Sequence, residues 1–246
     1  MKVGFIGLGR MGHGMAEQIL GAGYDLAIYD QVPELLEKLG LAGATVAISV
    51  VEVVADRDLI ISMLPHDEAL EELAFSKKGL LKYMAKGAIH MPSGTHGIKI
   101  IRQLTNAHKE AGQTLVAGHV LGRPDLASKG QLTIVSGGPP NILKHLQPIF
   151  DVLGKQTFIA GDEPQTATAV KIADDIRKYC GKTVVLETLR RSLKSQMREA
   201  GRCNAITTLI LGEDELNNNH IIIKNMETGS QNNIPISELI KYINSK

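Results

Sequence analysis

The stretch Val3-Gly4-Phe5-Ile6-Gly7-Leu8-Gly9-Arg10-Met11-Gly12-His13-Gly14 decides the fold of the N-terminal part. It begins with a short apolar run typical of a buried strand, continues with glycines at positions 7, 9 and 12, and leads into an amphipathic segment ending at Gly21. A strand before this glycine spacing and a helix after it predict the phosphate-binding turn of a dinucleotide-binding βαβ unit. The predicted contact residues are Gly7, Leu8, Gly9, Arg10, Met11 and Gly12.

An acidic residue follows at the position where such a unit recognises a ribose. Asp30 ends the apolar run Leu26–Tyr29 and stands 18 positions after Gly12. A carboxylate there can accept hydrogen bonds from both ribose hydroxyls of NAD and repel the additional phosphate of NADP. We therefore predict NAD rather than NADP, with one alternative in which Asp30 only caps a turn before Pro33.

Apolar strands alternate with amphipathic helices through the first 160 residues, which predicts parallel βαβ units. This part is expected to be an α/β domain with a Rossmann-like doubly wound sheet. The expected strands are Val3–Ile6, Leu26–Tyr29, Leu59–Met63, Ala88–Met91, Thr114–Ala117, Leu132–Ser136 and Thr157–Ala160, and the expected helices are Gly14–Gly21, Pro33–Leu39, Gly97–Glu110 and Asn141–Leu153.

Residues 161–246 are expected to form a smaller α/β domain, with a junction between about 157 and 176. The pattern predicts helices at Gln165–Tyr179, Leu193–Arg202 and Ile236–Ile243, and strands at Thr183–Leu186, Ile206–Leu211 and His220–Lys224. No obvious linker separates the two parts. The strand Thr157–Ala160 and the helix after it could belong to both parts.

The composition excludes several classes of protein. The chain has 246 residues, 43% of them hydrophobic, and a formal net charge of +1, which disfavours long nucleic acid as a partner. Without a signal-like start or an apolar run long enough for a membrane span, we expect a cytoplasmic protein that does not bind membranes. Two cysteines and eight scattered histidines predict neither a disulfide framework nor a metal site.

The N-terminal part resembles the β-hydroxyacid dehydrogenases, the family of 3-hydroxyisobutyrate and 6-phosphogluconate dehydrogenases. The resemblance rests on Gly7–Ala16, Ser62-Met63-Leu64-Pro65, Ser93-Gly94-Thr95 and Gly161–Lys171. It implies an NAD-binding domain in which Met63, Leu64 and Pro65 lie along the adenosine ribose and nicotinamide side, with Thr95 near the nicotinamide. It also implies a small hydroxy acid as substrate.

The same resemblance implies residues that act on the substrate. Gly122 and Arg123 fall in the family's substrate loop, here Gly-Arg-Pro-Asp, and Lys171 falls on its proton-transferring lysine. Members of the family carry an asparagine four residues after that lysine, whereas this chain has Asp175. On a helix, Asp175 would tie Lys171 into an ordinary solvated ion pair, which works against proton transfer.

The C-terminal part resembles the anticodon-binding domain of histidyl-tRNA synthetase. Four segments in order carry this resemblance: Lys171–Lys178, Ser192–Ala200, Leu211–Leu216 and Lys224–Gln231. A basic stripe of Arg190, Lys194, Arg198 and Arg202 repeats every four residues along one predicted helix. A solvated helix face explains the stripe equally well, and the part has little net charge, so tRNA binding is not expected.

These observations support one hypothesis and two alternatives. The chain is interpreted as a chimera, built rather than inherited, that binds NAD(H) and has little or no turnover, because the helical domain of the dehydrogenases has no counterpart after Lys171. The first alternative is a functional NAD-dependent oxidoreductase that uses Lys171 on a small β-hydroxy acid. The second is a module that docks RNA or a protein partner through the C-terminal part.

Overall fold

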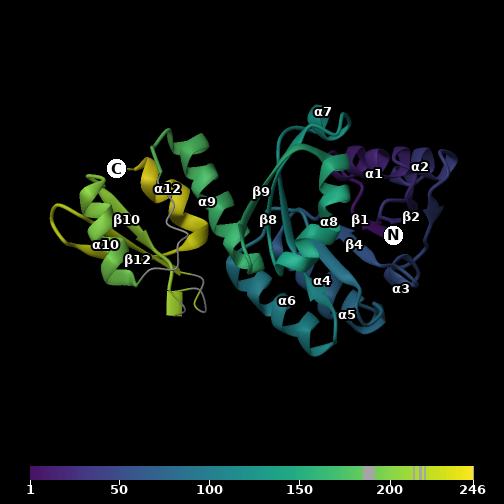
Figure 1. The fold of residues 1–246 in the computed structure, drawn as a ribbon, viewed down its shortest axis with the longest axis horizontal. Coiled ribbons are helices and arrows are strands. Elements are labelled where there is room, and N and C mark those ends of the chain that lie inside the picture. The colour runs from purple at the N-terminus through teal and green to yellow at the C-terminus, as the bar shows by residue number, and fades with distance from the viewer. Residues whose placement is uncertain (185–191, 213, 216–217, 219, 246) are drawn as a thin grey trace. The chain divides into compact units, whose positions relative to one another are not determined.

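A six-stranded parallel sheet in the order β3-β2-β1-β4-β5-β6 is the framework of the N-terminal part. Its strands β1, β2 and β4 are labelled in Figure 1. The computed structural model describes residues 1–184, 192–212, 214–215, 218 and 220–245. The strands are β1 (Lys2–Ile6), β2 (Asp25–Tyr29), β3 (Thr45–Val46), β4 (Leu59–Ser62), β5 (Ile89–Pro92) and β6 (Thr114–Leu115). The strand order is that of a dinucleotide-binding fold, and it confirms the predicted Rossmann-like class.

Helices cover both faces of this sheet. They are α1 (Gly12–Gly21), α2 (Glu37–Leu41), α3 (Val50–Val54), α4 (Asp67–Phe75), α5 (Leu80–Tyr83), α6 (Ile98–Glu110), α7 (Pro124–Ala127) and α8 (Pro140–Leu153), with a 3-10 turn η1 (Pro33–Leu35). Successive strand residues point to opposite faces, so Phe5 and Ile61 pack with α1 and α8, and Ile6 and Ile60 pack with α3 to α6. Two apolar cores therefore hold the sheet between them.

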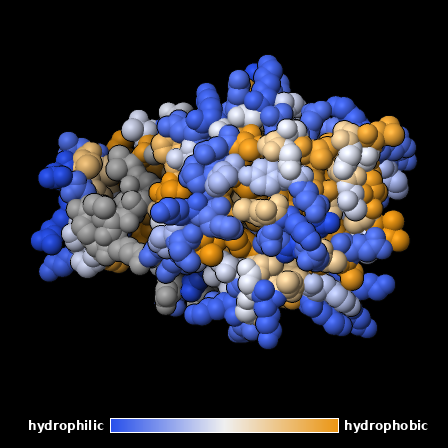
Figure 2. All heavy atoms as spheres, turned by 45° about the vertical axis from the view of Figure 1, so that its right-hand side comes forward, coloured by the Kyte–Doolittle hydropathy of each residue, from blue (hydrophilic) through white to orange (hydrophobic). Residues whose placement is uncertain are grey.

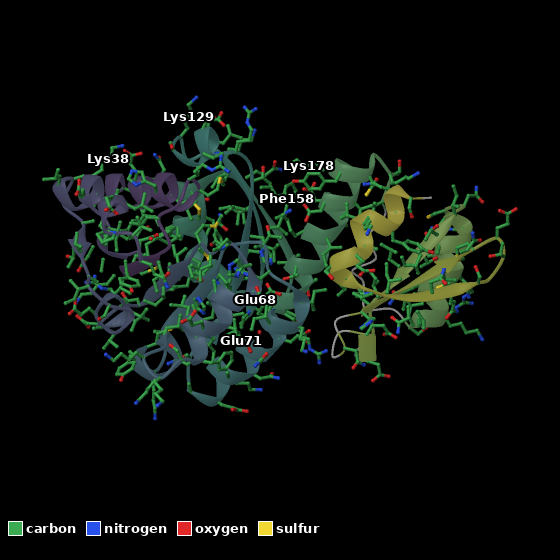
Figure 3. The ribbon with its side chains drawn as sticks, turned by 180° about the vertical axis from the view of Figure 1, so that it is seen from behind. Lys38, Glu68, Glu71, Lys129, Phe158 and Lys178 are labelled. Carbon is green, nitrogen blue, oxygen red and sulfur yellow. The ribbon has the colours of Figure 1, made fainter. Side chains whose placement is uncertain are left out.

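A second, three-stranded sheet extends this part in the order β7-β8-β9. Its strands are β7 (Ala117–Leu121), β8 (Leu132–Gly137) and β9 (Gly154–Gly161), with β7 antiparallel and β9 parallel to β8. The predicted strand Thr114–Ala117 is confirmed in its first part, where β6 pairs with β5, but from Ala117 the chain forms a different strand that pairs with β8. Phe158, labelled in Figure 3, lies on β9, and its side chain is 49% exposed.

The C-terminal part contains a separate antiparallel sheet in the order β10-β11-β12. Its strands are β10 (Thr207–Ile210), β11 (His220–Asn225) and β12 (Gln231–Pro235), and its helices are α9 (Pro164–Cys180), α10 (Leu193–Arg202) and α12 (Leu239–Asn244), with a 3-10 turn η2 (Ile236–Glu238). Ile176 of α9, Ile221 and Ile223 of β11, and Leu239 of α12 form its buried core.

Two sequence predictions in this part need correction. Strand β12 was not predicted, because its polar residues Gln231, Asn232 and Asn233 have low strand propensity, yet it pairs with β11 over five residues. The predicted strand Thr183–Leu186 is not seen: residues 183 and 184 belong to no strand, and residues 185 and 186 lie outside the described residues.

The fold divides into two compact units, Met1–His96 with Ile100–Thr168, and Gly97–Lys99 with Ala169–Lys246. Strand β9 pairs with β8 in the first unit, whereas Ile172 and Ile176, in the second half of α9, contribute to the apolar core of the second. The βα unit β9-α9 thus serves both, although β9 does not join the C-terminal sheet. Within the described ranges, every helix is too short or too polar to cross a bilayer.

Candidate functional site

The loop between β1 and α1 closes tightly on itself. Gly7 has a φ of +92°, and a Cβ on Gly12 would lie 1.9 Å from the carbonyl oxygen of Gly7. Residues with a side chain rarely adopt this positive φ at position 7. The distance of 1.9 Å leaves no room for a methyl group at position 12. The backbone N–H of Gly7 also donates to the carbonyl of Tyr29, 3.0 Å away, which ties the loop to β2.

The outer side of this loop is open. A Cβ on Gly9 would meet no atom within 4 Å, and both Gly9 and Arg10 are exposed in the turn just before α1. The first N–H groups of a helix have no partner within the helix and attract anions. A closed inner side and an open outer side therefore fit the pyrophosphate of a dinucleotide.

Asp30 anchors the loop at the end of β2. Its Oδ2 accepts a hydrogen bond from the backbone N–H of Leu8 at 2.6 Å, and its Oδ1 accepts one from Val32 at 2.9 Å. The second bond caps the turn before Pro33, so the turn-capping alternative describes part of what Asp30 does. A carboxylate offers about four acceptor sites, which leaves capacity for ribose hydroxyls.

A hollow of about 790 Å³ opens beside Asp30, between the end of β2, α2 and the edge strand β3. Leu41, Val46 and Ile48 line it and remain exposed, and apolar residues are visible at the surface in Figure 2. An acidic group at the margin of an apolar hollow is a suitable setting for a ribose that carries a base.

The loops after β4 and β5 pack against one another at the carboxyl end of the sheet. A Cβ on Gly94 would lie 2.4 Å from the carbonyl oxygen of Leu64, while Pro65 and Thr95 are exposed. The structure therefore brings Met63–Pro65 and Ser93–Thr95 together, as expected for neighbouring parallel strands.

Two buried polar atoms in this region have no hydrogen-bond partner, Ser93 Oγ and His96 Nε2. The other ring nitrogen of His96, Nδ1, faces Asp67 Oδ1 at 3.3 Å. Buried polar atoms are usually paired, and an unpaired one calls for an explanation such as a ligand. Their position next to Thr95 fits a polar group bound beside this loop.

A buried chain of hydrogen bonds begins at Ser62, the residue before Met63–Pro65. Sequence reasoning missed this chain. Ser62 Oγ lies 2.9 Å from His90 Nε2, His90 Nδ1 lies 2.9 Å from His108 Nε2, and His108 Nδ1 lies 2.8 Å from Gln113 Oε1. Burial holds the pKa of His90 well below its usual range and lowers that of His108 to about 4. No sequence spacing signals this chain, because its members come from β4, β5, α6 and the segment after α6.

The predicted substrate loop lies at the end of β7. Gly122 has a φ of +153°, and Arg123 precedes α7 with its Nε 3.2 Å from Asp125 Oδ1. The Arg123 side chain is 79% exposed. A guanidinium in this position can recognise a carboxylate, and its role with a substrate stays a prediction.

Lys171 forms an ion pair with Asp175 one turn further along α9. The side chains are 13% and 20% exposed, so the pair is half-buried, whereas the sequence predicted a solvated pair. A charged pair with restricted access to water is held more firmly than a surface pair. The Lys171 ammonium group is thus occupied by a neighbour on its own helix.

The basic stripe on α10 is only partly available. Lys194 and Arg198 are exposed, Arg202 pairs with Glu199 at 2.7 Å, and Arg190 lies outside the described residues. Among the residues that the structure describes, no group of three His, Cys, Asp or Glu side chains is placed to hold a metal ion.

Comparison with known proteins identifies the N-terminal part. Residues 2–161 match the family model of the NAD binding domain of 6-phosphogluconate dehydrogenase. The chain belongs to this family. The match spans all the predicted cofactor residues from Gly7 to Thr95, and it confirms the predicted family and a dinucleotide-binding domain.

Relatives of this NAD-binding domain include oxidoreductases of bacteria. The chain is 37% identical over 173 residues to the uncharacterized oxidoreductase YfjR of Bacillus subtilis, covering 70% of this chain and 60% of the relative. It is 35% identical over 162 residues to the NAD-dependent L-serine dehydrogenase of Pseudomonas aeruginosa, covering 66% and 54%. The chain therefore spans little more than half the length of these relatives.

A solved structure shares the fold. The 3-hydroxyisobutyrate dehydrogenase of Mycobacterium tuberculosis, solved with L-serine, aligns with a TM-score of 0.69 at 20% identity and covers 82% of this chain and 66% of that one. At this identity the similarity concerns the fold alone.

The C-terminal part matches a second family model. Residues 153–246 match an anticodon binding domain. The two matches overlap at residues 153–161, a range that contains all of β9. Strand β9 contains the predicted strand Thr157–Ala160, which could belong to either part, and it lies within both matched ranges.

Proposed function

We propose that the first unit binds NAD(H) at the carboxyl end of its parallel sheet, within a chimera of two family segments that has little or no turnover. The observation that supports NAD(H) binding most strongly is the glycine loop, which is closed at Gly12, open at Gly9 and anchored by Asp30. The family match and the unpaired Ser93 Oγ and His96 Nε2 support the proposal. Calorimetric titration of the full chain with NADH tests this proposal.

The residues of the chain have separate tasks in this proposal. The first turn of α1 holds the pyrophosphate, Asp30 holds the adenosine ribose, and the loops of Met63–Pro65 and Thr95 orient the nicotinamide end. When bound, the nicotinamide supplies hydride chemistry for a small hydroxy acid. Arg123 is proposed to bind the carboxylate of that acid.

Asp30→Asn is expected to change the choice between the two cofactors. The amide oxygen can still accept the N–H of Leu8, which keeps the loop anchored, although the amide nitrogen cannot replace Oδ1 as the acceptor for the N–H of Val32. The negative charge that repels the NADP phosphate is lost. We expect the wild type to bind NADH at least about tenfold more tightly than NADPH, a difference of about 1.4 kcal/mol, and the variant to bind them within about threefold. Equal affinities in the wild type would contradict this role of Asp30.

Turnover is proposed to be limited by the ion pair of Lys171. Asp175→Asn removes the carboxylate and leaves a neutral hydrogen-bonding group, so Nζ becomes available to move a proton at a hydroxyl oxygen. We expect a rise in NADH formation of at least about tenfold over a panel of small β-hydroxy acids that includes L-serine and 3-hydroxyisobutyrate.

Lys171→Ala is the matched control for this experiment. It should show no activity in either background. Substantial turnover by the wild type that disappears in Lys171→Ala would instead support a functional β-hydroxyacid oxidoreductase. Binding of tRNA is left out of the proposal, because the pairing of Arg202 with Glu199 reduces the free positive charge of α10.

A further inference from the structure

His119 of β7 is a fully buried histidine with partners at both ring nitrogens. Its Nδ1 lies 2.8 Å from the carbonyl oxygen of Gly94, and its Nε2 lies 2.8 Å from Thr168 Oγ1. Both His119 and Thr168 are 1% exposed. One side chain therefore connects the loop after β5 with the start of α9 inside the first unit.

The chemistry of the partners fixes the position of the ring proton. A carbonyl oxygen only accepts hydrogen bonds, so Nδ1 of His119 carries the proton that is donated to Gly94. In the neutral ring Nε2 is then an acceptor, and the hydroxyl of Thr168 donates to it. Thr168 thus stabilises the tautomer that can hold Gly94.

The carbonyl oxygen that His119 holds belongs to the loop proposed to orient the nicotinamide. Gly94 is flanked by Ser93 and by the exposed Thr95, and a Cβ on Gly94 would lie 2.4 Å from Leu64 O and 2.6 Å from His96 Nε2. Gly118, next to His119, lets β7 pack closely against Met91 of β5, because a Cβ on Gly118 would lie 2.7 Å from Met91 Cγ. A movement of Gly94 would therefore disturb both cofactor loops.

We propose that His119 is a positioning residue that sets the backbone of Gly94 and Thr95 for the nicotinamide end of the cofactor, with Thr168 setting its tautomer. His119 acts through the loop and needs no contact with the cofactor. This inference rests on the proposed binding of NAD(H). It extends that proposal by assigning a task to two buried residues outside the glycine loop.

Two substitutions separate the two hydrogen bonds of the ring. In His119→Asn the side-chain amide replaces Nδ1, so donation to Gly94 is kept and the bond to Thr168 is lost. In His119→Gln the amide replaces Nε2, so the bond to Thr168 is kept and donation to Gly94 is lost. The two variants have similar polarity, and thermal unfolding of each checks that the chain still folds.

The decisive readout compares NADH with ADP-ribose, which has no nicotinamide. Calorimetric titration of the full chain is expected to show that His119→Gln weakens NADH binding about tenfold and leaves ADP-ribose binding within about twofold of the wild type. His119→Asn should keep both affinities within about threefold. Thr168→Val should weaken NADH binding selectively, because it removes the donor that fixes the tautomer.

The outcomes distinguish this inference from the proposed function. A wild type that binds neither ligand overturns the proposed function, and the role of His119 falls with it. A wild type that binds NADH, together with a Gln variant that loses NADH and ADP-ribose equally, shows a general structural role and overturns the inference alone. Equal effects of Asn and Gln on NADH overturn it as well.

Discussion

Gly9→Ala is expected to abolish measurable dinucleotide binding while leaving the thermal stability of the chain unchanged. The new Cβ would meet no protein atom within 4 Å, so the fold has room for it. The same methyl group would occupy the open side of the loop, where a pyrophosphate must approach the backbone. We expect a loss of NADH affinity of at least about 100-fold, or about 2.7 kcal/mol.

Substitutions at two other glycines, Gly12 and Gly21, provide matched comparisons for the Gly9→Ala variant. Gly12→Ala places a Cβ 1.9 Å from Gly7 O, so it should lower the free energy of unfolding by about 3 kcal/mol and also remove binding. Gly21→Ala meets no atom within 4 Å at the far end of α1, and should stabilise the chain by about 0.5–1 kcal/mol with binding intact. Gly9→Ala binding NADH as tightly as the wild type would contradict the placement of the phosphates.

Acid is expected to destabilise the first unit through the buried chain from Ser62 to Gln113. The amide nitrogen of Gln113 donates to the carbonyls of Leu81 and Met84, at 3.1 and 2.9 Å, so its Oε1 accepts from His108. Each following contact then holds one proton, donated in turn by His108, His90 and Ser62. A further proton would place two donors against each other in a buried site.

The pKa shifts give the direction and size of this effect. Burial lowers the pKa of His108 from 6.5 to about 4, so the unfolded chain binds a proton more readily than the folded one between these values. The free energy of unfolding is therefore highest above pH 6.5 and falls as the pH drops toward 4. His108 alone accounts for about 3 kcal/mol, and His90, whose pKa is also lowered by burial, adds to it.

Urea unfolding at a series of pH values measures this dependence. His108→Gln should reduce the fall in stability between pH 6.5 and 4 by about 3 kcal/mol, because the variant has no ring to protonate. His145→Gln, on the exposed side of α8, is the matched control and should follow the wild type. A His108→Gln variant with an unchanged acid dependence would show that the histidine chain is not the acid-sensitive element.

The sequence predicts those parts of the fold that depend on local patterns. The glycine spacing of Gly7, Gly9 and Gly12, together with Asp30 at a strand end, locates the phosphate loop and its anchor because turn geometry restricts the residues there. The alternation of strands and helices predicts the doubly wound sheet, whose observed order is β3-β2-β1-β4-β5-β6.

Features that depend on long-range contacts were not predictable in the same way. His90 and His108 stand 18 positions apart, and His119 and Thr168 stand 49 positions apart, so no local spacing signals either pair. Strand β12 was missed because pairing with β11 outweighs the low strand propensity of its asparagines.

Titration of the full chain with NADH, beside the Gly9→Ala variant, tests the central claim most directly. We expect one NADH site per wild-type chain and no detectable binding by the variant at equal thermal stability. A wild type that releases no binding heat and shows no stabilisation at millimolar NADH would contradict it.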